Sequence, residues 1–211
     1  GSLIEYAVLR EYLQPNVKNI LWVYYEGNDL IELKDELNSQ ILSKYIENKK
    51  FSQNLKTKQN LIDELGFQMI KKKFNAKEKE LILKQKYTSN EMIKSFKIYN
   101  VRALISKTIS KFITKPEEKS LPFYEFQEIL KMANELAIKN NSKLYFVYLP
   151  EYSRYRYRNF DNSSYLRIKK IINDLNIPLI DLHIELFQKT KNPLKFYPFQ
   201  RSGHANELGN K

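Results

Sequence analysis

Hydrophobic and polar positions follow one another along the chain in blocks that predict helices and strands in turn. Apolar residues share one helical face in residues 3–13, and residues 20–25 are apolar or aromatic at every position. We expect a strand over 18–25 that is covered on both faces, as in a parallel sheet between helical layers. A Gly-Asn-Asp turn follows it, and a helical pattern then runs over residues 30–45.

The same rhythm returns in the last third of the chain. Helical patterns and apolar strand patterns alternate there: helices over 123–139, 162–175 and 183–189, and strands over 143–150 and 177–181. Such alternation predicts a parallel sheet with right-handed crossovers. The fold class we expect is α/β, with a three-layer flavodoxin-like parallel sheet.

The region between these two parts has a different composition. Residues 47–119 are rich in Lys, Asn, Glu and Gln, and their apolar residues recur only at helical spacing. We therefore predict a helical insertion or cap over 47–119, and an α/β domain built from 1–46 and 120–211. We expect that domain to be incomplete at both ends, because the chain opens directly on one helical pattern and closes on an unfinished one.

Composition narrows the classes of function. The chain has 211 residues, and 36 Lys and Arg against 24 Asp and Glu give it a net charge of +12. This surplus favours an anionic partner, although a solubilising charge spread over helix faces is the commoner explanation of such a surplus. No cysteine is present, only two histidines occur, and no phosphate-loop or dinucleotide fingerprint is found. No apolar run approaches the ~20 residues of a membrane helix. We expect no metal, no cofactor and no transmembrane segment.

Asn28 and His204 are the residues that carry candidate chemistry. Asn28 follows the first predicted strand, at the edge where open α/β sheets bind ligands. A histidine base beside a side-chain amide donor is what acyl transfer requires. By itself the Gly27-Asn28-Asp29 turn is typical of any strand-to-helix connection, with Asp29 suited to be the N-cap or a first-turn carboxylate of the next helix.

Two motifs resemble those of the SGNH (GDSL-type) hydrolase superfamily. Residues 25–30, Tyr-Glu-Gly-Asn-Asp-Leu, resemble its Gly-x-Asn-Asp block, with the Gly one place later than usual. Residues 203–209, Gly-His-Ala-Asn-Glu-Leu-Gly, resemble its closing His-x-Asn-x-x-Gly block. The resemblance covers residues 1–46 and 123–211. It implies a serine esterase or O-acyltransferase that acts on an acylated carbohydrate or lipid, in an extracytoplasmic or membrane-anchored full-length protein.

The resemblance also implies roles for individual residues. Asn28 would donate its amide to the oxyanion, and loss of such a donor costs ~10²–10³ in rate. His204 would act as the general base, with Gly27 and Asp29 supporting the turn. Glu26 would either contact the substrate or hydrogen-bond the turn.

Two departures from the family pattern qualify these roles. The Gly-Asp-Ser block that holds the nucleophile is absent, and Ser2 leads directly into a helix, so we reject it and expect residues 1–211 to be inactive. Arg201 stands where the family usually has Asp, and a guanidinium has no acceptor for an imidazole N–H. Either a backbone carbonyl or another carboxylate, with Asp181 as a candidate, orients His204, or the site is degenerate.

The segment 152–158 alternates arginine and tyrosine. Arg154, Tyr155 and Arg156 are candidate substrate-binding residues, because Arg holds phosphate or carboxylate and Tyr stacks on a sugar or base. The same pattern suits a mobile lid whose tyrosines pack on the insertion. The alternative function is therefore a non-catalytic binding module for an anionic polymer or glycan. We do not expect nucleic acid to be a partner.

Overall fold

The computed structural model describes residues 1–86, 121–200 and 204–209. The chain divides into two compact units, residues 1–53 with 118–211 and residues 54–117. In the second unit the described part holds η1 (Lys56–Lys58) and α4 (Gln59–Lys86). The remainder of the predicted insertion, with its apolar positions at Met92 and in 101–112, lies outside the described residues.

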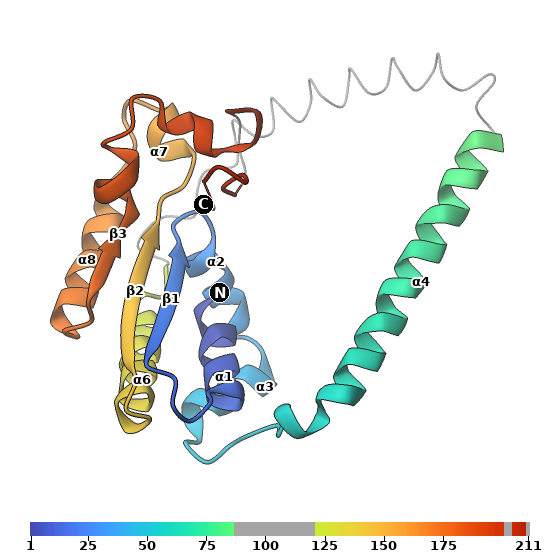
Figure 1. The fold of residues 1–211 in the computed structure, drawn as a ribbon, viewed down its shortest axis with the longest axis horizontal. Helices are drawn as coiled ribbons and strands as arrows, with labels where there is room; N and C mark the ends of the chain where they lie inside the picture. The colour runs from blue at the N-terminus through green and yellow to red at the C-terminus, as the bar shows by residue number, and fades with distance from the viewer. Residues whose placement is uncertain (87–120, 201–203, 210–211) are drawn as a thin grey trace. The chain divides into compact units, whose positions relative to one another are not determined.

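The first unit contains a parallel sheet of three strands in the order β1-β2-β3 (Figure 1). Their bounds are β1 Asn19–Tyr25, β2 Lys143–Leu149 and β3 Leu179–Asp181. Tyr25 lies opposite Leu149, and Tyr148 lies opposite Asp181. The three strands therefore end at one common edge, and the prediction of an α/β fold with a parallel sheet is confirmed.

The helices of this unit are α1 (Ser2–Tyr12), α2 (Asp29–Glu36), α3 (Gln40–Glu47), α6 (Phe123–Lys139), α7 (Ser153–Arg156) and α8 (Ser163–Asp174), followed by the short helices η3 (His183–Phe187), η4 (Pro193–Phe196) and η5 (Pro198–Gln200). The single helix predicted over 30–45 is wrong. The chain turns after Glu36, and the Ser39 side chain accepts a hydrogen bond from the Leu42 N–H at 3.4 Å, which caps a new helix.

The boundary of the first unit lies several residues beyond the predicted one because Arg10 holds the chain there. Its guanidinium donates hydrogen bonds to the backbone carbonyls of Tyr45, Asn48, Lys49 and Phe51. Residues 48–51 are thereby tied to α1 rather than released into the insertion.

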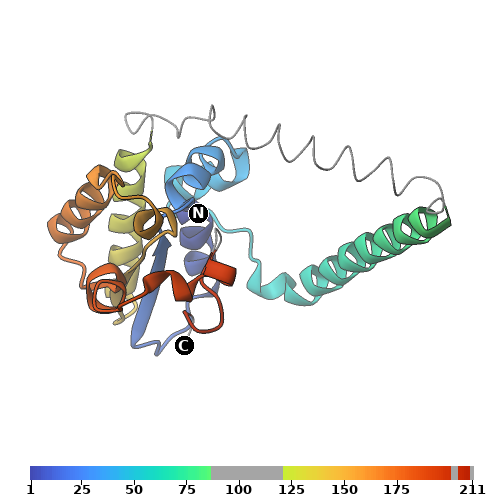
Figure 2. The ribbon, with the colours of Figure 1, turned by 90° about the horizontal axis from the view of Figure 1, so that it is seen from above.

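One face of the sheet carries the main core. The buried strand side chains on this face alternate along β1 and β2: Trp22, Tyr24, Leu144, Phe146 and Tyr148. Buried residues of α1, α6 and α8 pack in the same cluster, and Figures 1 and 2 show α6 (yellow) and α8 (orange) along one side of the strands. This packing follows the alternation of side chains expected in a strand.

The opposite face of β1 is largely open, which corrects the prediction of a strand covered on both faces. Leu21 is 61% exposed and Val23 is 48% exposed. A second apolar cluster, built on Phe187, Phe196 and Tyr197, packs against Leu149 at the carboxyl end of the sheet. Among the described residues, no strand pairs with the outer edge of β1. The apolar run is the same in either environment, so the sequence could not distinguish one covered face from two.

Candidate functional site

The turn after β1 is fixed by two residues of the predicted motif. The Asp29 carboxylate accepts the backbone N–H of Tyr25 at 2.7 Å, and burial raises the pKa of this carboxyl group. Asp29 is the first residue of α2, so its first-turn position is as predicted, but its side chain closes the turn and does not cap the helix. A Cβ on Gly27 would lie 2.4 Å from the Tyr25 ring, so a larger residue at this position would force that ring to move.

The Asn28 amide has a defined orientation. Its Nδ2 donates a hydrogen bond to the Glu32 carboxylate one turn later in α2. Because a carboxylate only accepts, this bond fixes which side of the amide carries nitrogen. The Asn28 Oδ1 is buried without a partner among the described residues. Nδ2 carries a second hydrogen, which is the donor that the oxyanion role predicted for Asn28 would use.

His204 lies beside the same turn. Its ring contacts the Tyr25 ring with centroids 4.6 Å apart and an interplanar angle of 41°. Tyr25 is the last residue of β1 and precedes Asn28 by three positions. The structure therefore brings the two predicted residues to the same end of β1, and the His204 side chain is exposed there.

The motif that follows His204 forms a turn and not the predicted start of a helix. The backbone N–H of Asn206 donates to the Phe196 carbonyl at 2.8 Å, and its side chain donates to the Lys195 carbonyl at 2.8 Å. The Gly209 N–H returns to the Asn206 side chain at 3.0 Å, and a Cβ on Gly209 would meet the Phe196 carbonyl at 2.9 Å. Hydrogen bonds of Asn206 and the close packing of Gly209 therefore hold residues 204–209 against η4.

Asp181 is not placed to orient His204. Its carboxylate accepts the Tyr165 hydroxyl at 2.6 Å and forms an ion pair with Lys169 at 3.4 Å. It ends β3, two strands away from β1. Within the described residues, no carboxylate is hydrogen-bonded to His204.

Glu26 and Arg154 neutralise each other. The Arg154 Nε donates to the Glu26 carboxylate at 2.8 Å, a second nitrogen bonds its other oxygen, and the side chains are only 4% and 6% exposed. The Glu26 carboxylate also accepts the Glu151 N–H at 3.0 Å. Tyr148 hydroxyl and Asn162 complete the contacts of Arg154. This arrangement does not support the substrate-binding roles predicted for Glu26 and Arg154; it ties the turn after β1 to the segment after β2.

Tyr155 belongs to a cluster that sequence reasoning did not identify. Its hydroxyl lies 2.8 Å from His183 Nδ1, and its ring stacks on Phe187 with centroids 5.1 Å apart. Gln188 Nε2 lies 3.1 Å from His183 Nε2. Burial and the nearby Arg154 charge lower the pKa of His183. The signal in the sequence was the position of His183 just after β3, equivalent to that of Asn28 after β1.

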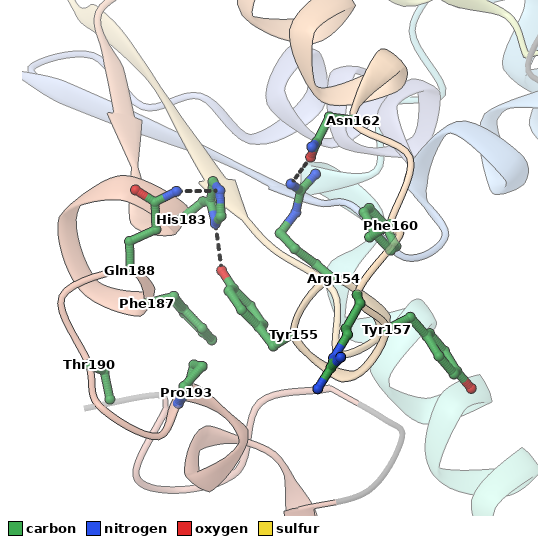
Figure 3. A pocket seen from close by; sticks show the side chains of 11 residues that line it. Arg154, Tyr155, Tyr157, Phe160, Asn162, His183, Phe187, Gln188, Thr190 and Pro193 are labelled. Atoms are coloured by element: carbon green, nitrogen blue, oxygen red, sulfur yellow. Dashed lines mark hydrogen bonds between the residues drawn. The ribbon is translucent and has the colours of Figure 1, made fainter.

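A cavity of about 390 Å³ opens beside this cluster (Figure 3). It lies between the segment after β2 and the segment after β3, so it shares the carboxyl edge of the sheet with Asn28. Its lining residues are Arg154, Tyr155, Tyr157, Arg158, Phe160, Asn162, His183, Phe187, Gln188, Thr190 and Pro193. Arg156, the remaining predicted substrate-binding residue, is exposed outside this lining.

Other candidate groups are placed less favourably for chemistry. Ser2 is fully buried in the first turn of α1, in agreement with its rejection as a nucleophile. In the described parts of the chain, no three His, Asp or Glu side chains are grouped so that they could hold a metal ion. None of the described helices combines the length and the apolar character that crossing a bilayer requires.

In comparisons with known proteins, no family model matches this chain, and no curated protein and no solved structure matches it.

Proposed function

We propose that this chain supplies two parts of an acyl-transfer site, the oxyanion donor Asn28 and the general base His204. The full-length protein would be an SGNH-type serine esterase or O-acyltransferase with an acylated carbohydrate or lipid as substrate. The observation that carries the proposal is the contact between the His204 and Tyr25 rings. The imidazole therefore lies at the end of β1, and Asn28 follows that strand end by three residues.

Among the described residues the outer edge of β1 has no paired strand, which leaves room there for a strand that carries the serine nucleophile. A cavity of about 290 Å³ lies between α1 and β1, lined by Glu5, Val8, Leu9, Ile20, Leu21, Trp22 and Val23. In a flavodoxin-like sheet, a further parallel strand would pair with β1 here and would end at the level of Tyr25. A serine at the end of that strand would stand beside both Asn28 and His204.

The chemistry follows from these positions. The serine oxygen attacks the ester carbonyl while His204 takes the serine proton. The tetrahedral oxyanion accepts the second N–H of Asn28, and His204 returns the proton to the leaving alkoxide. Water then cleaves the acyl-serine in an esterase, or an acceptor hydroxyl takes the acyl group in a transferase. His204 accepts the proton of that second nucleophile and gives it to the departing serine oxygen.

The test uses the longest natural reading frame that contains residues 1–211. We expect a fluorophosphonate probe to label one serine outside residues 1–211, and p-nitrophenyl acetate to be hydrolysed. His204→Gln should abolish both, and Asn28→Ala should slow turnover by ~10²–10³. Asn38→Ala, an exposed asparagine just beyond α2, is the matched control and should change neither. Labelling of a serine within 1–211, or labelling that survives His204→Gln, would disprove the proposal.

A non-catalytic module for an anionic glycan is the second candidate. The observation in its favour is that no described carboxylate is hydrogen-bonded to His204, where an active triad would have one. In this case the long reading frame would bind acidic polysaccharide but would show no probe labelling and no turnover.

A further inference from the structure

We propose that the cavity beside α7 and η3 binds a sugar ring that carries one acidic group. This site is separate from Asn28 and His204, and binding there does not depend on acyl transfer. The cavity lies at the carboxyl edge of the sheet, between residues 154–162 after β2 and residues 183–193 after β3 (Figure 3). Its volume of about 390 Å³ falls in the ~300–1,000 Å³ range of small-ligand pockets.

The apolar part of the cavity is aromatic. Tyr155 and Phe187 stack at an interplanar angle of 13° and form one wall (Figure 3). Phe160 and Tyr157 also line the cavity. Phe187 is almost fully buried and packs against the half-buried Tyr155 ring, so Tyr155 offers the rigid face of this stack, whereas Tyr157 is 63% exposed. Rigid aromatic surface of this kind suits the C–H face of a sugar ring, which needs contact area without a matching charge.

The charge of the lining is positive. No Asp or Glu is among the lining residues, and the charge of Arg154 is neutralised by Glu26. Arg158 is exposed and has no ion pair among the described residues. One unpaired guanidinium therefore remains at the cavity. Its planar fork matches a carboxylate or a phosphate in a two-bond geometry.

A hydrogen-bond network supplies a donor for sugar hydroxyls. The Gln188 amide nitrogen donates to His183 Nε2, so the proton of the neutral imidazole lies on Nδ1 and is donated to the Tyr155 oxygen. The Tyr155 hydroxyl then keeps its own hydrogen for a ligand. Thr190 donates its hydroxyl to the Leu186 carbonyl at 2.8 Å, which leaves its oxygen as an acceptor. A sugar hydroxyl both donates and accepts hydrogen bonds, so a donor and an acceptor in the same lining suit it.

Titration of residues 1–211 with D-glucuronate, D-glucose, D-glucose 6-phosphate and inorganic phosphate tests the proposal. Binding is measured by calorimetry and by amide shifts at low salt. We expect saturable binding of at least one acidic sugar, with shifts at residues around the cavity. Glucose, which lacks the acidic group, should bind about tenfold more weakly or worse. The comparison of glucuronate with glucose 6-phosphate shows whether the acidic group is a carboxylate or a phosphate.

Two arginines of one segment provide the matched variants. Arg158→Gln should weaken binding of the acidic sugar about tenfold or more and leave glucose binding unchanged. Arg156→Gln removes the same charge from an exposed position outside the lining and should change neither. Tyr155→Phe should weaken the binding of both the acidic sugar and glucose. The proposal would be overturned if neither acidic sugar bound saturably, if the two arginine variants lost binding equally, or if inorganic phosphate bound as tightly as glucose 6-phosphate.

Discussion

Replacement of Glu5 by Gln is expected to stabilise the protein at neutral pH. Glu5 lies on α1 and lines the cavity beside β1, and its Oε2 is buried without a partner among the described residues. Burial, with a smaller contribution from the Asp29 charge, raises the pKa of this carboxyl group from 4.5 to about 8. The folded protein therefore binds the Glu5 proton more tightly than the unfolded chain does.

The size of the effect follows from that pKa. A folded-state pKa above the unfolded one gives stability that is fully present below pH 4.5 and is lost as the pH rises through about 8. Each pH unit between these limits lowers the free energy of unfolding by about 1.4 kcal/mol. At pH 7 the buried Glu5 carboxyl group therefore lowers the free energy of unfolding by about 3 kcal/mol relative to its value below pH 4.5. A glutamine cannot ionise, so Glu5→Gln should recover most of this free energy at pH 7 and almost none at pH 4.5.

The assay is urea unfolding at several pH values between 4.5 and 8, with the two proteins compared at each pH. Glu185→Gln is the control, because Glu185 is an exposed glutamate whose i,i+4 ion pair with Lys189 is worth only ~0.3–0.5 kcal/mol. The reasoning is refuted if Glu5→Gln is no more stable than the parent protein at pH 7. It is equally refuted if the gain is the same at pH 4.5.

Two further substitutions address the buried pair and the open face. Arg154→Met should lower the free energy of unfolding by about 3–5 kcal/mol, because it leaves the Glu26 carboxylate buried and unpaired. The double variant with Glu26→Gln should regain part of that loss in urea unfolding; no recovery would contradict the assignment of the pair. Leu21→Lys should change unfolding by less than about 0.5 kcal/mol, since the side chain is 61% exposed. It should reduce self-association in light scattering, and unchanged association would show that this face is not adhesive.

The elements with strong local signals were predictable. The helix Phe123–Lys139 matches its predicted bounds, because a regular apolar face precedes an Asn-Asn-Ser stop. The strand that follows it was also correct to within one residue. The position of Asn28 at a strand end followed from the same local reasoning. These features depend only on the order of residues within about twenty positions.

Contacts between distant residues were not predictable. Glu26 and Arg154 meet only because β1 and β2 pair in a register that places the Glu26 N–H 3.0 Å from the Leu149 carbonyl. Nothing in the local pattern of either residue specifies that register. Likewise, the pairing of Tyr155 with His183 requires the order of β2 and β3, and both residues alone are compatible with an ordinary loop.

The connection between β1 and β2 has a consequence for how freely the sequence within it can change. This connection contains the whole of 54–117, whereas β2 and β3 are joined by a much shorter segment. The entropy of closing a flexible loop grows only with the logarithm of its length, so each doubling costs about 0.6 kcal/mol. Even a flexible connection of twice the length would therefore cost the α/β unit little stability. The length of the connection is thus a weak thermodynamic constraint on the α/β unit that carries Asn28 and His204.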